Sequence, residues 1–189
     1  MTEALRDEEQ TPEVLTSERV YEGAVWDIRS DRFRYGDGEI VRQYVDHPGA
    51  VAIVAIDDEE RVALIQQYRH PIRHRDWELP AGLLDIEGEE PLLAAQRELA
   101  EEVDLVAGQW ESLPSIFATP GGSNEIIHFF LATDLSAAPA AYAREEEEAD
   151  IRIEWIPLAE AVTAVREGRM RNALLAIGVL TASLRHAER

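Results

Sequence analysis

Residues 82–105 read GLLDIEGEEPLLAAQRELAEEVDL and combine a glycine-bearing turn with an acidic helix. Because helical residues advance about 100° each, positions three and four apart are neighbours. Glu98, Glu101 and Glu102 therefore project from one face of the predicted helix. Arg97 lies four residues before Glu101, where its guanidinium can hold that carboxylate. A core stripe is predicted on the adjacent face, formed by Leu92, Ala95, Leu99 and Val103.

Three carboxylates on one helical face repel one another, at a cost of a few tenths of a kcal/mol for each pair. A hard divalent cation removes that penalty, because carboxylate oxygens are its preferred ligands. Taken alone, the cluster is more typical of a solvated acidic face, since Glu is a good helix former and charge runs usually face water.

Bulk composition indicates one domain with at most a small appendage, from 189 residues without cysteine. The polar, acidic N-terminal stretch lacks the features of a signal peptide, and no apolar run approaches the roughly 20 residues of a membrane span. A cytoplasmic protein is expected. The formal net charge of −20 disfavours nucleic acid and anionic membranes as partners.

The first third of the chain predicts a disordered segment at 1–16 and a small antiparallel sheet subdomain at 17–47. Gly36-Asp37-Gly38 between strand-forming runs is a hairpin signal. Residues 48–189 form the main domain.

Strand patterns continue at 50–56, a buried apolar run, and at 61–68, which we expect to return as a hairpin at the middle of a sheet. Residues 69–76 are predicted to be a basic loop. The remaining predictions are strands at 110–118, 125–132 and 151–155, loops at 119–124 and 134–144, and helices at 158–167 and 170–186.

The last helix is expected to pack on the core through Ala173, Leu174, Ile177, Leu180, Thr181 and Leu184. Strands, one helix, further strands and two final helices indicate an α/β sandwich with a mixed sheet between helices.

The spacing within 82–105 resembles the Nudix box of hydrolases acting on nucleoside diphosphates linked to a further group. The matching positions are Gly82, Glu89, Arg97, Glu98, Leu99, Glu101, Glu102 and Leu105. One extra residue lies between Gly82 and Glu89, in the loop, where insertions are tolerated. Asp104 replaces the usual second glycine, and Asp tolerates a left-handed cap better than most residues.

Further motifs resemble the ADP-ribose pyrophosphatase subfamily, most of all its actinobacterial members. They are the lead-in at 77–82, Pro120 fifteen residues past Leu105, the loop at 118–123 and the Glu-Glu-Ala-Asp run at 147–150. The resemblance implies a Nudix-type α/β/α sandwich with a mixed central sheet, and a homodimer joined through the N-terminal sheet.

The same resemblance implies two to three Mg²⁺ or Mn²⁺ ions per site and a role for each box residue. Glu98 and Glu102 are the principal catalytic metal ligands, with Glu101 and the backbone carbonyl of Ala81 as further ligands. Glu89 and Arg97 orient the loop and the ligands behind them. For Arg97, an ordinary surface ion pair with Glu101 is the alternative.

The general base is expected outside the helix, on the acidic run that includes Glu148, with Glu147 as the next candidate; Glu148 is also an expected metal ligand. The alternative for this run is a solvated acidic face. The predicted substrate-binding residues are Arg42, Arg69, Trp77, Glu78, Leu83, Gly121, Ser123 and Glu125. Ordinary alternatives are a surface arginine for Arg69, a core residue for Trp77 and a strand-edge carboxylate for Glu125.

The resemblance implies metal-dependent hydrolysis of ADP-ribose to AMP and ribose 5-phosphate. Within the family, the alternatives are sugar nucleotides, NADH and dinucleoside polyphosphates. Outside catalysis, they are a ligand-binding regulator that keeps the fold and an acidic cation buffer. The intact box carboxylates disfavour the regulator, because a pure binder has no need of all three.

Overall fold

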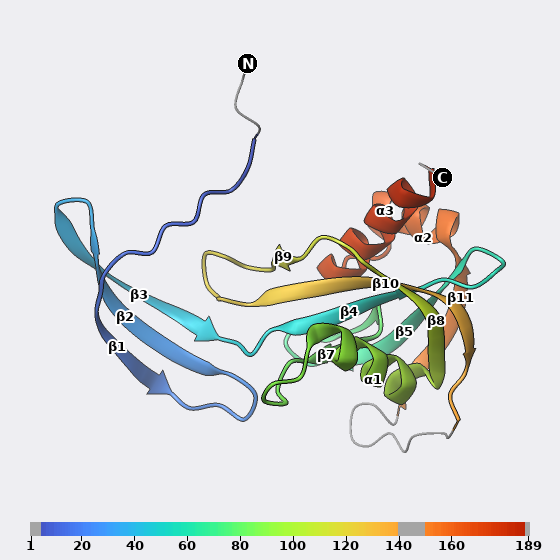
Figure 1. The fold of residues 1–189 in the computed structure, drawn as a ribbon, viewed down its shortest axis with the longest axis horizontal. Coiled ribbons are helices and arrows are strands. Elements are labelled where there is room, and N and C mark those ends of the chain that lie inside the picture. Colours follow the sequence, from blue (N-terminus) through green and yellow to red (C-terminus); the bar gives the residue numbers. More distant parts are fainter. Residues whose placement is uncertain (1–4, 140–149, 188–189) are drawn as a thin grey trace. The chain divides into compact units, whose positions relative to one another are not determined.

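The computed structural model describes residues 5–139 and 150–187. These residues divide into two compact units (Figure 1). One contains Met1–His47 and Thr119–Glu125, and the other contains Pro48–Ala118 and Ile126–Arg189. No helix in the described ranges is both long enough and apolar enough to cross a membrane.

The first unit is a three-stranded antiparallel sheet in the order β1-β2-β3. Its strands are β1 (Val14–Tyr21), β2 (Asp27–Tyr35) and β3 (Gly38–Asp46). The predicted hairpin is confirmed: Tyr35 pairs with Gly38, and Gly36 takes φ 59°, which favours glycine. β1 begins at Val14, inside the segment expected to be disordered. Ser123 adds a bridge to Val45, which brings the 119–125 loop into this unit.

The second unit contains the remaining strands and all three helices of the described residues. They are β4 (Ala50–Ala55), β5 (Arg61–Arg69), β6 (His74–Glu78), β7 (Ala81–Leu83), α1 (Pro91–Val103), β8 (Leu105–Ser112), β9 (Ile116–Phe117), β10 (Ile126–Ala137), β11 (Arg152–Pro157), α2 (Leu158–Arg166) and α3 (Ala173–Ala187). One sheet runs β7-β4-β10-β8, with β9 on β10, and a second runs β11-β5-β6. The first sheet is mixed, since β10 is parallel to β4 and antiparallel to β8.

The strands lie between α1 on one side and α2 with α3 on the other (Figure 1). Every residue of β4 is buried, and its side chains alternate between two apolar clusters. Val54 packs with α2 and α3, whereas Ile53 packs with α1. This two-sided burial confirms the predicted α/β/α sandwich.

The predicted hairpin between β4 and β5 is wrong. The two strands belong to different sheets and share only an isolated bridge between Ile56 and Val62. β4 instead pairs in parallel with β10, far along the chain. Such partners are chosen by the fit of two buried surfaces, which a local apolar pattern cannot report.

The loops predicted at 69–76 and 134–144 are also partly wrong. β6 begins at His74 and pairs with β5, so the basic loop is shorter than expected. β10 continues to Ala137, which pairs with Leu105 of β8. Pairing with a neighbouring strand overrides the weak strand preference of the Ala-rich segment.

The buried face of α3 agrees with the prediction only in part: Leu174 and Ile177 pack against the core as expected. Leu175, Val179 and Ala182 are buried, whereas Leu180 and Leu184 are exposed. Gly178 accounts for the change in which face is buried, because a Cβ on residue 178 would lie 2.5 Å from Leu79 Cδ1. The helix can approach the sheet closely only on its glycine side.

The core stripe of α1 is confirmed except at its start. Ala95, Leu99 and Val103 are buried, but Leu92 is 37% exposed and Ala94 is buried instead. Leu92 lies in the first turn, and helical side chains tilt toward the N-terminus. Its side chain therefore points away from the packed turns.

Candidate active site

The acidic helix α1 begins at Pro91 and ends at Val103, with Asp104 at its C-terminus as predicted. Pro91 occupies the first turn, where its missing N–H removes no helical bond. At the other end, Asp104 adopts the left-handed conformation, with φ 57° and ψ 35°. Its N–H donates to the carbonyl of Ala100 at 3.1 Å. Asp104 thus adopts the left-handed backbone conformation expected of the glycine that usually stands at this position of the box.

Arg97 is the centre of the carboxylate cluster. Its Nε and Nη2 donate to the two oxygens of Glu89 at 3.2 and 3.0 Å. Its Nη1 donates to Glu98 Oε1 at 2.6 Å and to Glu101 Oε2 at 3.1 Å. The hydrogen bonds with Glu89 are the largest of several effects that raise the pKa of Arg97, against the opposing effect of burial. Arg97 therefore stays charged and orients three carboxylates at once.

Gly82 is required by the position of Glu98. A Cβ on residue 82 would lie 2.0 Å from Glu98 Cδ, so any side chain there displaces the carboxylate. The side chain of Glu98 is only 12% exposed. The glycine that opens the motif therefore makes room for a carboxylate sixteen positions later in the sequence.

Glu102 is buried and is held by the strand beside it. Its exposed fraction is 4%, and its Oε2 accepts from the Ala81 N–H at 2.8 Å. Ala81 is positioned by β7, which pairs with β4 at Ala52. The structure thus gives the amide of Ala81 a partner in the cluster, in addition to the ligand role expected for its carbonyl.

The donor set fits a divalent cation in its chemistry. Three carboxylates, from Glu89, Glu98 and Glu101, bind the guanidinium of Arg97, and Glu102 on the same helix adds a fourth acidic side chain. Their oxygens are the hard donors that Mg²⁺ and Mn²⁺ prefer. Within 5–139 and 150–187, no three His, Cys, Asp or Glu side chains gather closely enough to hold an ion by themselves. The complete ligand set remains a prediction.

The predicted base and fourth carboxylate ligand, Glu148, lies outside the described residues, as does its neighbour Glu147. The chain is described again from Asp150, whose carboxylate pairs with Arg75 at the start of β6.

Arg69 and Glu78, both predicted to bind substrate, bind each other. Arg69 Nε and Nη2 donate to Glu78 Oε1 and Oε2 at 2.8 and 2.7 Å. The side chain of Glu78 is 6% exposed and that of Arg69 is 44% exposed. Gln67, which the sequence patterns did not single out, donates to Glu78 Oε2 at 3.3 Å. The signal available for it was its place two residues before Arg69, on the same face of the strand.

Two other predicted substrate residues have packing roles. Trp77 is half-buried against the apolar cluster below α2 and α3, which fits its alternative as a core residue. Leu83 is half-buried in β7 and pairs with Ala50.

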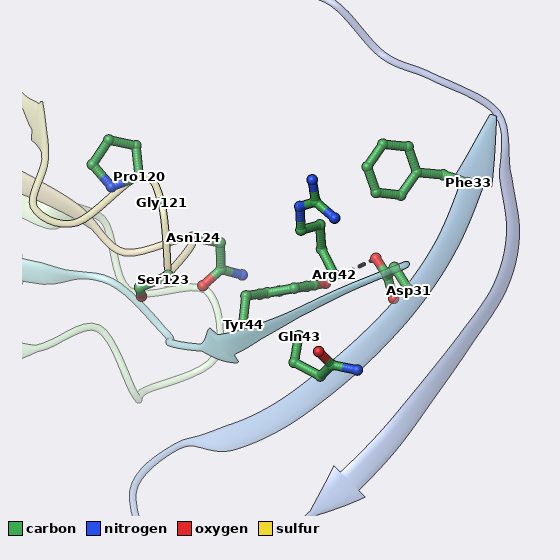
Figure 2. A pocket seen from close by; sticks show the side chains of 10 residues that line it. Asp31, Phe33, Arg42, Gln43, Tyr44, Pro120, Gly121, Ser123 and Asn124 are labelled. Carbon is green, nitrogen blue, oxygen red and sulfur yellow. Dashed lines mark hydrogen bonds between the residues drawn. The ribbon is translucent and has the colours of Figure 1, made fainter. Parts of the chain in front are cut away.

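The other predicted substrate residues belong to the N-terminal unit. Arg42, Gly121 and Ser123 line a pocket of about 380 Å³, together with Asp31, Phe33, Gln43, Tyr44, Pro120, Gly122 and Asn124 (Figure 2). Asp31 accepts from the Tyr44 hydroxyl at 3.2 Å through Oδ2, while its buried Oδ1 has no hydrogen-bond partner among the described residues. Burial, followed by the charge of Asp31, raises the pKa of Tyr44.

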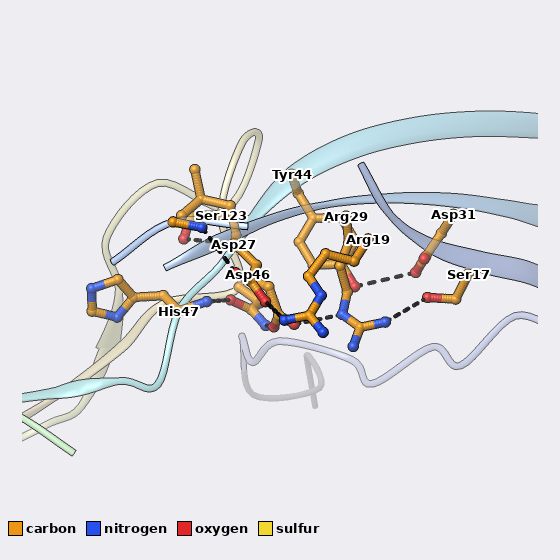
Figure 3. A network of polar contacts seen from close by, with 12 residues as sticks. Ser17, Arg19, Asp27, Arg29, Asp31, Tyr44, Asp46, His47 and Ser123 are labelled. Carbon is orange, nitrogen blue, oxygen red and sulfur yellow. Dashed lines mark hydrogen bonds and ion pairs between the residues drawn. The ribbon is translucent and has the colours of Figure 1, made fainter. Parts of the chain in front are cut away.

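A polar network in the same unit supports the pocket loop (Figure 3). Asn124 Nδ2 donates to Asp46 Oδ1 at 2.7 Å, and Arg29 Nε binds the other oxygen of Asp46 at 2.5 Å. Oε1 of Glu125 lies 3.7 Å from Nε2 of His47, one residue before β10 begins. This position fits the alternative of a carboxylate at the edge of a strand.

The family model described as NUDIX domain matches residues 46–175. ADP-ribose pyrophosphatase of Mycobacterium tuberculosis is 44% identical over 89% of this chain and 81% of its own length. Methanol dehydrogenase activator of Bacillus methanolicus is 35% identical over 92% and 93%. A solved structure of an ADP compounds hydrolase superposes with a TM-score of 0.77 at 22% identity, covering 94% and 95% of the two chains, which supports the fold.

Proposed function

Because this chain belongs to the NUDIX family, we propose that it hydrolyses the pyrophosphate bond of ADP-ribose to AMP and ribose 5-phosphate. The observation that carries the proposal is the seating of Glu98 and Glu102 against Gly82 and Ala81, with Arg97 behind them. Their low exposure, 12% for Glu98 and 4% for Glu102, and their fixed contacts support a role as ligands. The relatives named ADP-ribose pyrophosphatase support the choice of substrate.

The carboxylate cluster would hold divalent cations, which when bound would neutralise phosphate charge and lower the pKa of a water. We propose Mg²⁺ or Mn²⁺, two to three ions per site, with Glu98 and Glu102 as the principal ligands. Glu101, Glu148 and the Ala81 carbonyl complete the proposed set. Arg97 and Glu89 hold the ligands in place, as their hydrogen bonds indicate.

The reaction adds water across one P–O bond of the diphosphate. The water oxygen bonds to one phosphorus as that phosphorus loses the bridging oxygen, which leaves on the other phosphate. The proton of the water passes to a general base, for which Glu148 is the proposed residue and Glu147 its alternative. Arg69 is proposed to bind a phosphate of the substrate, because a guanidinium can donate two parallel hydrogen bonds to phosphate oxygens.

The N-terminal unit offers further substrate contacts. Arg42, Gly121 and Ser123 share one pocket, and Glu125 stands at its loop. Leu83 is proposed to contact the substrate from β7. Trp77 and Glu78 support the site from the core and through Arg69, respectively.

We also propose a cytoplasmic homodimer joined through the N-terminal sheet. Exposed apolar side chains are frequent there, and a partner subunit would cover them. They are Val14, Val20, Tyr21, Val25, Trp26, Tyr35 and Val41. The substrate is proposed to be a small molecule, and the acidic composition disfavours nucleic acid and anionic membranes as partners.

Turnover of ADP-ribose, NADH, UDP-glucose and GDP-mannose with Mg²⁺ or Mn²⁺ tests the substrate. ADP-ribose is expected to have the highest kcat/KM and to yield AMP and ribose 5-phosphate. A preference for any other compound in the panel contradicts the substrate proposal. Binding of ADP-ribose without turnover by the wild type favours the regulator instead.

Glu102→Gln tests the metal-binding helix. The amide oxygen can still accept from the Ala81 N–H, so the fold is expected to persist while kcat falls by about 10³-fold. Glu154→Gln, an exposed strand carboxylate, is the matched control and should leave kcat unchanged. Unchanged turnover in Glu102→Gln would falsify the metal mechanism.

A further inference from the structure

Three polar side chains gather on the α1-facing side of the β5–β6 pair. Ala63 and Ile65 of β5 pack with α1, and strand side chains repeat every second residue. Gln67 and Arg69 continue that face. On β6, Trp77 packs on the opposite side, so Glu78 joins them.

Glu78 is a buried carboxylate whose hydrogen-bond donors include Arg69 and Gln67. An isolated buried carboxylate is costly, and the bidentate guanidinium pair offsets that cost. Gln67, itself 5% exposed, fixes one oxygen of Glu78 from the side. The carboxylate thus has little freedom to rotate.

Arg69 is held along its Nε–Nη2 edge, while its side chain remains 44% exposed. A guanidinium is planar, so fixing one edge fixes the direction of the others. Arg69 therefore presents a preoriented cation on the face of the sheet that carries α1. An unrestrained arginine would lose more side-chain entropy on binding a ligand.

We propose that Glu78 and Gln67 are positioning residues, which aim the Arg69 guanidinium at a phosphate of the diphosphate substrate. Glu78 then acts on the substrate only through Arg69. This inference rests on the proposed function and extends it, because it replaces direct substrate contact by Glu78 with an indirect role and adds Gln67.

A double-mutant cycle separates positioning from a merely structural ion pair. The variants are Arg69→Lys, Glu78→Gln and their combination, with Gln67→Leu as a fourth. Lysine keeps the positive charge beside the buried carboxylate, so folding is retained, but it cannot form the bidentate pair. Glu154→Gln on neighbouring β11, whose pair with Arg152 is exposed, is the matched control.

We expect Arg69→Lys and Glu78→Gln each to raise the KM for ADP-ribose by about 10- to 100-fold with kcat changed less than threefold. The combined variant should have the same KM as Arg69→Lys alone, because Glu78 then has no guanidinium to orient. Gln67→Leu should raise KM by about threefold. Thermal unfolding of each variant and calorimetric titration with ADP-ribose accompany the kinetics.

Additive effects of Arg69→Lys and Glu78→Gln on KM overturn the inference, as does an unchanged KM in Glu78→Gln. A lowered melting temperature with unchanged KM assigns the pair a structural role and also overturns it. If the wild type hydrolyses none of the panel, the proposed function fails, and the same cycle is then followed by calorimetry. Non-additive binding constants there support positioning, and absence of binding overturns both proposals.

Discussion

At the scale of single residues, Gly82 has a steric requirement that bears directly on the carboxylate cluster. The opening glycine of the acidic motif faces Glu98 across a distance that leaves no room for a methyl group. Its importance is steric, because its φ is not in the left-handed region. Sequence spacing alone marked Gly82 as part of a motif without revealing this reason.

Gly82→Ala is therefore expected to displace the Glu98 carboxylate. Turnover should fall by about 10²-fold, as a misplaced catalytic group does, and stability by about 1–3 kcal/mol from overpacking. Activity assays and urea unfolding measure the two effects. Gly38→Ala, where a Cβ meets no atom within 4 Å, is the control. Equal effects at both glycines would contradict the steric explanation.

Asp104 illustrates a departure from a motif that the backbone accommodates. The residue keeps the left-handed conformation that the motif's glycine normally takes. Asp adopts this conformation at lower cost than most residues, since its short polar side chain can bond locally. The substitution leaves the end of α1 in place.

At the scale of elements, the turn between β4 and β5 is held by hydrogen bonds to Asp57. Asp57 Oδ1 accepts from the N–H groups of Glu59 and Arg61, and Oδ2 accepts from Arg61 Nε. Burial acts to raise the pKa of Asp57, but these hydrogen bonds outweigh it and lower the pKa. The ionised carboxylate thus fastens the chain as it passes between the two sheets.

Asp57→Asn should lower stability by about 1–2 kcal/mol at pH 7. Because the folded-state pKa is lowered, the stabilisation is present above the unfolded-state pKa of about 4 and is lost as pH falls through the folded-state value. Urea unfolding at several pH values should therefore show the two proteins converging below pH ~4. Asp58→Asn, at an exposed neighbour, should change little. A difference that persists in acid would refute the role of the charge.

At the scale of the whole molecule, the exposed apolar side chains of the N-terminal sheet support the proposed dimer. Val41 is 44% exposed on β3. Val41→Glu would place a charge in an apolar contact. We therefore expect the variant to have half the mass of the wild type in analytical ultracentrifugation at micromolar concentration. Leu184→Glu, on α3 and 69% exposed, should leave the mass unchanged. A monomeric wild type would rule out the dimer.

Much of the fold was predictable because its signals are local. The helix of Arg97 and Glu98, the hairpin at Gly36 and the buried strand at 50–55 each follow from neighbours in sequence. The face of α3 was not, because Gly178 meets Leu79 and Val54 from distant segments. The spacing of apolar residues predicts that a helix forms, but the surface on which the helix packs determines which of its faces is buried.

The sequence by itself determined the acidic helix and the proximity of Arg97 to Glu101, because positions three and four apart meet on any helix. The spacing of the motif from Gly82 to Leu105 indicated the family. Only the tertiary structure decided that β4 and β5 separate into two sheets, that Ala81 bonds Glu102 and that Glu78 holds Arg69. The physical reason is that strand pairing and buried ion pairs depend on which surfaces meet. Residues far apart in the chain then share one desolvated site, where a carboxylate must find its partner.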